Sequence, residues 1–264
     1  MMEPSDKIIP YKDLNPEITN ETVETEIDTT QVASISKENF WIDQRYYVVK
    51  FLGEGAFGAV FLVHDSINDH YLAMKMPKDN NNLPLFTREI EVMQQLEDGG
   101  RVDSGAVAHL LDFNIESGVM VSTNDELYAN DVSYLITEFA EGGDLASHII
   151  QNVSKFSFGI PELEVFDLFQ QLLEGIEDIH RRGFVHLDIK PENVLLFTNS
   201  KIAISDFALS KEIKGEDMNG NFIRYRAGSR QYWSPEMFTD LPYNGVQSDI
   251  FALGVILFIM TFGC

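Results

Sequence analysis

The sequence predicts an α+β fold in which a small antiparallel β segment with one helix precedes a larger, mainly helical segment. Short β-prone runs, which begin at Tyr46 and are separated by "GEGAFG" and "SINDH", are typical of an antiparallel meander. Residues 83–98 repeat apolar side chains at spacings of three and four, as an amphipathic helix does. After Gly143 helical periodicity predominates, so the chain changes its character near its middle.

Further strands are expected on both sides of this change. Two lie near "AHLLDF" and "VSYLITEF", and a long hairpin loop joins them. Farther along, "VLLF" and "KIAIS" predict a short strand pair. An irregular region and a final apolar helix follow this pair.

Two helices are expected between these strands. A short one covers residues 144–151, and a longer one begins near Pro161. Gly183 ends the longer helix, because glycine readily adopts the conformation that closes a helix. The buried stripe of this helix is expected to consist of Phe166, Phe169, Leu173, Ile176 and Ile179.

The charge of the chain limits its partners. It carries 42 acidic and 19 basic side chains, which gives a net charge of −23. Such a charge repels nucleic-acid phosphates and anionic lipids and attracts cations, so we expect no nucleic acid and no membrane among the partners. Cys264 is the single cysteine, so no internal disulfide forms. An intracellular location, cytoplasmic or nuclear, is the simpler expectation.

Composition separates an N-terminal arm from a folded region. Residues 1–43 are rich in acidic side chains and show little apolar periodicity, so we expect a disordered acidic arm. The folded region covers 44–264, with the β-rich part over about 44–140 and the helical part over about 141–264. The uncharged run from Ile250 to Cys264 is shorter than the roughly 20 residues that span a membrane. A buried core helix is therefore expected, and a tail anchor is the alternative.

Three glycines lie in a loop between two predicted strands. Gly53, Gly55 and Gly58 lack a Cβ, so backbone amides there can approach phosphate oxygens closely. In a dinucleotide-binding unit the same glycines would open a helix, but the residues that follow suit a strand. The pattern predicts a phosphate-binding loop, and a plain glycine hairpin is the alternative.

A lysine and a glutamate extend this prediction. Lys75 alternates with Ala73 on a predicted strand, and a lysine directed to the interior needs an anion. Glu89, on the following predicted helix, is a suitable partner. With the glycine loop they predict a phosphate clamp, in which Lys75 binds nucleotide phosphates and Glu89 fixes the lysine. Taken singly, each would be a surface charge.

Polar residues gather in the stretch "VHLDIKPENVLL". Asp188, Lys190 and Asn193 are expected on an exposed turn, where a carboxylate, a cation and an amide oxygen can converge. Asp206 stands at the end of another short strand. Asn193 and Asp206 offer hard oxygen ligands suited to Mg²⁺, whose charge offsets that of phosphates. Asp188 is then available to accept a hydroxyl proton.

Motifs of a known family occur in order along the chain: "GEGAFGAV", "AMK", "REI", "HLDIKPEN", "SDFA", "SPE" and "SDIFALGVI". On these motifs the chain resembles the eukaryotic protein kinase family from about Tyr46 to its last residue. Lys190, two residues after Asp188, is similar to the lysine of the serine/threonine branch. Ser229 matches the hydroxyl residue that, in that branch, bonds the catalytic aspartate and lysine. The resemblance implies a two-lobed protein kinase domain that lacks the family's last helices. It also implies ATP-dependent phosphorylation of serine or threonine in protein substrates.

The resemblance implies a role for each matching residue. Two Mg²⁺ ions would bridge the ATP phosphates at Asn193 and Asp206, while Asp188 would orient the attacking hydroxyl. Lys190 would stabilise charge on the transferred group.

The resemblance also implies a nucleotide pocket. Thr137 would be a small gatekeeper, backbone groups near Glu138 and Ala140 would hold adenine, and Asp144 would bond the ribose. The remaining nucleotide contacts that it implies are Leu52, Val60, Ala73 and Leu195.

Two substitutions depart from the family pattern. Leu187 replaces the usual arginine before the catalytic aspartate, so no guanidinium there pairs with a phosphorylated activation loop. Ala208 replaces a glycine and restricts φ. A pseudokinase-like nucleotide-binding or regulatory module, or an inactive kinase fragment, is therefore the main alternative, and a small-molecule phosphotransferase is the third. Asp144, Glu192 and the overall acidity predict basic residues near the target hydroxyl.

Overall fold

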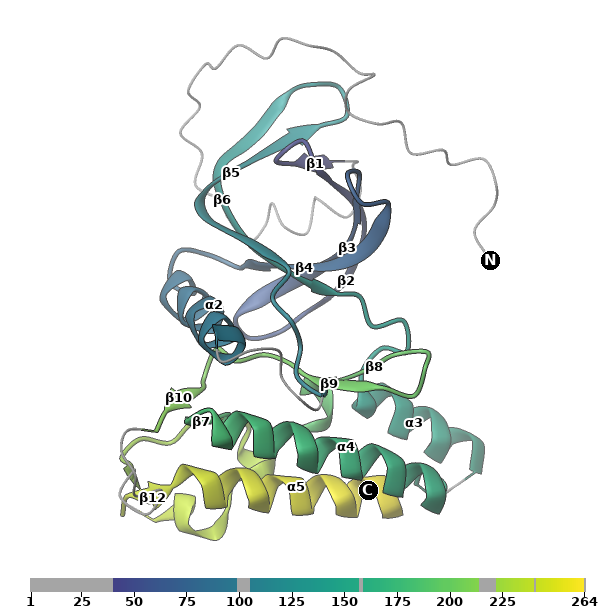
Figure 1. Cartoon of the computed structure of the whole chain (residues 1–264), viewed down its shortest axis with the longest axis vertical. Helices are drawn as coiled ribbons and strands as arrows, with labels where there is room; N and C mark the ends of the chain where they lie inside the picture. Colours follow the sequence, from purple (N-terminus) through teal and green to yellow (C-terminus); the bar gives the residue numbers. More distant parts are fainter. Residues whose placement is uncertain (1–39, 99–104, 157–158, 214–221, 240, 264) are drawn as a thin grey trace. The chain divides into compact units, whose positions relative to one another are not determined.

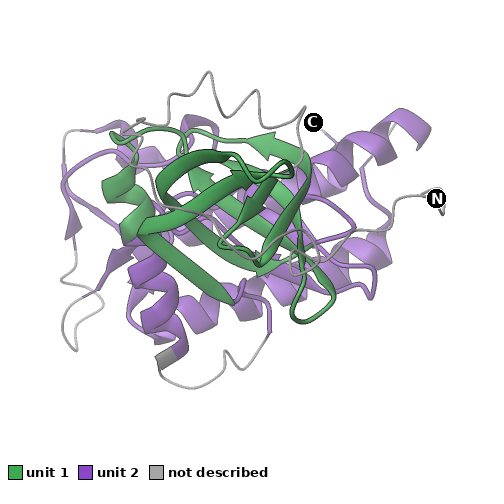
Figure 2. Ribbon diagram, turned by 90° about the horizontal axis from the view of Figure 1, so that it is seen from above, with its two compact units in different colours: residues 1–87, 110–139 green, residues 88–109, 140–264 purple. Residues whose placement is uncertain are grey.

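The computed structural model describes residues 40–98, 105–156, 159–213, 222–239 and 241–263. These residues form two compact units, which Figure 2 colours separately. The first unit holds the described residues up to Thr87 together with residues 110–139, and the second holds the rest. Strands dominate the first unit and helices the second, so the predicted α+β class is confirmed.

The first unit is a closed antiparallel barrel, labelled in Figure 1. The strand order is β1-β2-β3-β4-β6-β5, and β1 closes the barrel because it pairs with both β2 and β5. Side chains alternate along each strand, so one apolar set, which includes Phe61, Val63 and Met74, fills the interior. The strands are β1 (Phe40–Ile42), β2 (Tyr46–Glu54), β3 (Gly58–Asp65), β4 (His70–Pro77), β5 (Asp112–Ser122) and β6 (Leu127–Glu138).

Strand β1 falls within residues 1–43, which the sequence assigns to the acidic arm. Phe40, Trp41 and Ile42 are at most 1% exposed, so apolar burial makes this short segment part of the barrel. Residues 1–39 lie outside the described residues, and the disorder expected there stays a prediction.

The predicted long hairpin loop is instead the outer part of β5 and β6. These strands pair from Asp112 opposite Ile136 to Val121 opposite Leu127, with a short turn between them. Register shifts interrupt the pairing, and polar residues occupy many exposed positions. Both features obscure the period of two that identifies a strand.

A polar cluster fastens the turn between β1 and β2 to the neighbouring strands. The Asp43 carboxylate accepts hydrogen bonds from the Val119 N–H at 2.8 Å and from the Tyr134 hydroxyl at 2.6 Å. Arg45 pairs with Asp65 at 2.8 Å. Burial raises the pKa of Asp65, but hydrogen bonds, chiefly that from Arg45, outweigh burial and hold this pKa well below its usual range. These bonds therefore fasten the β1–β2 turn to strands β3, β5 and β6.

Helices form most of the second unit, and the boundary between the units falls within α2. Helices α4 and α5 lie side by side, as Figure 1 shows. The α-helices are α2 (Leu83–Asp98), α3 (Leu145–Phe156), α4 (Glu162–Arg181) and α5 (Gly245–Phe262), and the 3₁₀ helices are η2 (Pro191–Asn193), η3 (Arg230–Tyr232) and η4 (Pro235–Phe238).

Short antiparallel strand pairs connect these helices. The predicted pair is confirmed as β8 with β9, while β7 pairs with β10 and β11 pairs with β12. These strands are β7 (Phe184–Val185), β8 (Val194–Leu196), β9 (Ile202–Ile204), β10 (Lys211–Glu212), β11 (Phe222–Ile223) and β12 (Tyr243–Asn244).

Helix α4 buries only part of the stripe that the sequence predicts. Phe166 is 66% exposed and Leu173 is 44% exposed, whereas Leu168 and Leu172 are buried. Large apolar residues occupy two adjacent faces of this helix, so spacing alone does not identify the buried face. Ile176 and Ile179 are buried as predicted, so the prediction is correct toward the C-terminal end of the helix.

Helix α5 has the length and hydropathy of a membrane span, with a mean hydropathy of 1.8 over Gly245–Phe262. Its inner face is nevertheless buried within the unit, and Leu253 and Ile256 are at most 1% exposed. The Asn244 side chain accepts backbone N–H bonds at its N-terminus. The inner face agrees with the predicted core helix. Ile250, Phe251, Phe258 and Phe262 are each at least 40% exposed, so the choice between a core helix and a tail anchor stays a prediction.

Candidate active site

One face of the barrel sheet collects residues that the sequence assigns to nucleotide binding. Strands β3 and β4 pair Val60 with Lys75, and strands β4 and β6 pair Ala73 with Thr137. Their neighbours along the strands, such as Met74, fill the barrel core. Because side chains alternate, these four residues share the opposite face. The first unit therefore places the expected apolar and cationic contacts together.

The glycine loop joins β2 to β3 and so comes just before Val60 in the chain. A Cβ at Gly58 would lie 2.6 Å from the Met76 carbonyl oxygen, so packing against β4 requires glycine there. A Cβ at Gly53 or Gly55 would meet no atom within 4 Å. The backbone at these two positions is therefore open, as a phosphate-binding loop requires. Leu52, which is 38% exposed, precedes the loop.

Two predicted groupings extend across the unit boundary. Glu89 lies in α2 and is 2% exposed, but it belongs to the second unit and Lys75 to the first. The same division separates Glu138, at the end of β6, from Ala140. The clamp between Lys75 and Glu89 and the adenine contacts at Glu138 and Ala140 therefore stay predictions.

Asp188 is the centre of a hydrogen-bonded cluster in the second unit. Lys190 Nζ lies 2.7 Å from Asp188 Oδ2 and 3.1 Å from Ser229 Oγ. The Ser229 N–H donates to Asp188 Oδ1 at 2.7 Å, and Asn193 Nδ2 donates to the Asp188 carbonyl oxygen at 2.9 Å. The structure thus brings together Asp188, Lys190 and Asn193, and the bonds of Ser229 to Asp188 and Lys190 agree with the resemblance.

The sequence predicts that this cluster lies on an exposed turn, and the burial of two of its residues shows that prediction to be wrong. Asp188 and Asn193 are each 6% exposed. Burial of such groups is tolerated because each is hydrogen-bonded within the loop.

The environment of Asp188 keeps its side chain ionised. Burial raises the pKa of Asp188, but the hydrogen bond and charge of Lys190, together with the bonds from Ser229, lower it further, so the net pKa lies below its usual range. A depressed carboxylate pKa stabilises the fold above the unfolded-state pKa, and this contribution is lost as pH falls through the folded-state value. At neutral pH Asp188 is therefore a hydrogen-bond acceptor.

Asp249 was not singled out by sequence reasoning, yet it holds the backbone of this loop. Its Oδ2 accepts bonds from the His186 N–H at 2.9 Å and from His180 Nε2 at 2.9 Å, and its Oδ1 accepts from the Leu187 N–H at 2.9 Å. Asp249 is 1% exposed and lies near the start of α5. The signal available in the sequence was a single acidic residue immediately before a long apolar run. Asp249 is a positioning residue for Asp188.

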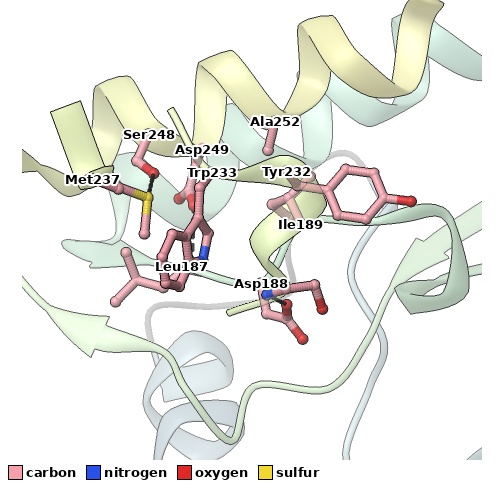
Figure 3. A pocket seen from close by; sticks show the side chains of 10 residues that line it. Leu187, Asp188, Ile189, Tyr232, Trp233, Met237, Ser248, Asp249 and Ala252 are labelled. Carbon is pink, nitrogen blue, oxygen red and sulfur yellow. Dashed lines mark hydrogen bonds between the residues drawn. The ribbon is translucent and has the colours of Figure 1, made fainter. Parts of the chain in front are cut away.

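Figure 3 shows Asp188 and Asp249 around a cavity of about 10 Å³. Trp233 and Met237 complete its apolar side. A cavity must reach roughly 10–15 Å³ to hold a single water, so this one does not admit a substrate. It is a small packing cavity beside the loop that carries Asp188.

Leu187, which stands where the family has arginine, joins an apolar cluster. Its φ is +67° and it is 6% exposed. The cluster also contains Ile223 from β11, Met237 from η4 and Tyr243 from β12. Leu187 thus connects the loop that carries Asp188 to the segment after Asp206 through apolar contact.

Ser205, which lies between β9 and Asp206, links this part of the chain to Asn193. The Ser205 N–H donates to the Asn193 carbonyl oxygen at 2.9 Å. Because Asn193 Nδ2 is bonded to the Asp188 backbone, the Asn193 amide oxygen is the atom suited to a metal. Asp206 lies two residues after the end of β9 and adopts a φ of +68°.

Asp144 has a structural partner of its own. Its carboxylate accepts bonds from the Ser147 N–H at 2.8 Å and the Ser147 hydroxyl at 2.9 Å, at the start of α3. Asp144 also forms an isolated bridge with Leu195. The structure thus places these two expected nucleotide contacts side by side, and the ribose role of Asp144 stays a prediction.

Comparison with known proteins relates this arrangement to a family. Residues 46–264 match the protein kinase domain. The chain is 29% identical over 225 residues to "CBL-interacting protein kinase 15" of Oryza sativa subsp. japonica, which covers 83% of this chain and 46% of that protein.

Two fungal proteins give similar results. The "Carbon catabolite-derepressing protein kinase" of Candida tropicalis is 31% identical over 219 residues, which is 83% of this chain and 32% of that protein. The "Serine/threonine-protein kinase cds1" of Schizosaccharomyces pombe is 29% identical over 245 residues, 88% of this chain and 46% of that protein. The chain spans less than half the length of these curated relatives.

Proposed function

Because the chain belongs to the protein kinase family, we propose that it transfers the γ-phosphoryl group of Mg-ATP to serine or threonine hydroxyls of proteins. The observation that carries this proposal is the cluster of Asp188, Lys190 and Ser229, in which a buried carboxylate is held by a cation and a backbone N–H. Such a carboxylate is fixed in position and remains able to accept a further hydrogen bond.

In the proposed reaction, Asp188 accepts a hydrogen bond from the substrate hydroxyl and directs its oxygen toward the phosphorus atom. Lys190 neutralises negative charge close to the transferred group. Asp249 keeps the loop backbone fixed, so the carboxylate does not reorganise when the hydroxyl arrives.

The donor set of the second unit fits Mg²⁺. Asn193 offers an amide oxygen and Asp206 a carboxylate, and Mg²⁺ prefers such hard oxygen ligands. When bound, the metal offsets the charge of the phosphates during transfer. In the first unit, the open backbone at Gly53 and Gly55 and the cation of Lys75 supply the phosphate contacts.

Basic residues near the target hydroxyl are part of this proposal. Glu192 is exposed in η2, between Asp188 and Asn193, so a cationic substrate side chain can approach it from solvent. The net charge of −23 favours the same partners. The single cysteine supports an intracellular, cytoplasmic or nuclear location.

A pseudokinase-like binding module is the second candidate, which the substitutions Leu187 and Ala208 favour. Ala208 is 2% exposed and does not adopt a positive φ. The structure therefore accommodates alanine there without left-handed strain. Leu187 has apolar partners of its own. Neither substitution removes a residue of the proposed chemistry, so catalysis remains the first candidate.

The chain can be tested with radiolabelled ATP and a mixture of serine, threonine and tyrosine peptides. We expect label on serine or threonine, dependent on Mg²⁺, and strongly reduced in Asp206→Asn because the metal loses a charged ligand. Lys201→Ala, which changes an exposed residue in the β8–β9 turn, is the control and should label peptides normally. ATP binding without label in any peptide would favour the binding module instead.

A further inference from the structure

A basic strip borders the catalytic cluster of this acidic chain. Residues 222–233 contain Arg224, Arg226 and Arg230 and no acidic residue, although acidic side chains outnumber basic ones 42 to 19 in the whole chain. All three arginines are exposed. A cationic surface beside Asp188 would attract anions where the rest of the chain repels them.

One of these arginines has a structural task. Arg226 Nε donates to the Met237 carbonyl oxygen at 3.1 Å, and Arg226 Nη2 donates to the Thr239 carbonyl oxygen at 3.4 Å. These bonds fasten the strip to η4 and the residue that follows it. Arg226 therefore accounts for the fold of the strip, and it is not the candidate for ligand recognition.

Arg230 is placed differently. Its guanidinium lies over the Phe238 ring, 5.6 Å from the centroid, and the Phe238 ring packs edge-on against the Trp233 ring at 5.5 Å. Trp233 Nε1 in turn donates to the Gly228 carbonyl oxygen at 3.1 Å. Stacking on an aromatic ring orients a guanidinium while its N–H groups stay available for an anion. Arg230 is thus oriented before any ligand binds.

The position of Arg230 along the chain connects it to the reaction centre. Ser229, its immediate neighbour, donates its N–H to Asp188 and contacts Lys190 through its hydroxyl. Consecutive Cα atoms are about 3.8 Å apart, and residues of an extended peptide rise by a similar distance. A substrate hydroxyl at Asp188 therefore has its neighbouring side chains within the reach of Arg230.

We propose that Arg230, oriented by Phe238, is a specificity-determining residue that binds a carboxylate-bearing side chain next to the target serine or threonine. Guanidinium and carboxylate groups pair through two parallel N–H bonds, so an aspartate or glutamate in the substrate is the expected ligand. This inference rests on the proposed kinase activity and names a feature of its substrate. The aromatic platform beside Arg230 favours an apolar residue near that acidic one.

Arg230 and Glu192 give the acceptor site charges of opposite sign. Tyr232, two residues after Arg230, has its pKa raised to about 12 by burial and by the charges of Glu192 and Asp188. The electrostatic influence of Glu192 therefore reaches the same helix, η3, that carries Arg230. A substrate with one basic and one acidic flanking residue would match both charges. A peptide bound in the reverse direction would place like charges next to each other.

The test scans glutamate and lysine through each position around a serine in a peptide array. It compares the full wild-type chain with Arg230→Ala, Arg230→Glu and, as the control of equal charge change, Lys201→Glu. We expect the wild type to prefer glutamate over lysine at one position by about fivefold in kcat/KM, as for an exposed charge pair. Arg230→Ala should lose this preference and Arg230→Glu should reverse it. Higher salt should weaken it.

Two further outcomes separate this inference from the proposed function. Transfer to peptides with the same ranking in all variants would overturn the role of Arg230 and leave the kinase proposal intact. If no peptide is labelled, fluorescence anisotropy of the glutamate and lysine peptides supplies a binding preference that needs no catalysis. Equal affinities of wild type and Arg230→Glu for the two peptides would then refute the inference.

Discussion

Gly228 provides the sharpest stability test of how the catalytic loop and the following segment fit together. Its φ is +77°, and a Cβ there would lie 2.1 Å from the Leu187 carbonyl oxygen and 3.1 Å from Asp188 Oδ1. A contact of 2.1 Å with a backbone atom is not possible for a real side chain, so Gly228→Ala must separate these two segments.

Gly183 is a matched control for the conformational part of this effect. Its φ is +82°, and a Cβ there would come only to 3.6 Å of the Ile213 carbonyl oxygen, which is an ordinary contact. Both alanine variants therefore carry left-handed strain of about 1–2 kcal/mol. Gly228→Ala must also displace the neighbouring backbone, and such overpacking costs about a further 1–3 kcal/mol or more.

Urea unfolding and steady-state transfer measure the two consequences. We expect Gly183→Ala to lose about 1–2 kcal/mol of stability and to keep its kcat, and Gly228→Ala to lose about 2–5 kcal/mol. The rate of Gly228→Ala should fall by about a hundredfold, since a shift near 1 Å at Asp188 misaligns the hydroxyl. Equal stability and equal kcat of the two variants would refute the described packing of Gly228 on Leu187.

Two other predictions concern the same loop. Asp249→Asn should lower the free energy of unfolding by about 1–3 kcal/mol, because one of the donors bonded to the carboxylate, such as the Leu187 N–H, would face an amide NH₂ and stay buried without an acceptor. Unchanged urea unfolding would argue against this anchor. Because Leu187 has apolar partners where the family has arginine, phosphatase-treated chain should keep its transfer rate within about twofold. A loss of activity on dephosphorylation would contradict that expectation.

Much of the fold follows from local patterns in the sequence. Periods of two and near 3.6 predict the strand-rich segment, helix α2 and the pairing of β8 with β9, because those residues have one buried face. Strand β1 escapes detection since three residues, Phe40–Ile42, are too few to show a period. Its closure of the barrel depends on β5, which is distant in sequence.

The candidate site likewise contains residues that the sequence predicts and residues that it does not. Sequence motifs identify Asp188, Lys190 and Asn193, because their chemistry is unusual among apolar neighbours. They do not reveal Asp249, whose partners are backbone N–H groups contributed by another segment. The resemblance implies the bonds of Ser229 to Asp188 and Lys190, which the structure contains. The local run of polar residues nevertheless predicts an exposed turn, because burial of Asp188 depends on partners such as Ser229 that lie far along the chain.

In the proposed function the Asp188 carboxylate positions a serine or threonine hydroxyl for phosphoryl transfer. Single-turnover transfer of label from saturating Mg-ATP to a serine peptide tests it directly, with Asp188→Asn compared with the wild type and ATP affinity measured in parallel. We predict a rate at least about a hundredfold lower in Asp188→Asn, as for the loss of a general base, with ATP affinity nearly unchanged. Equal transfer rates in the two proteins would contradict catalysis by this carboxylate.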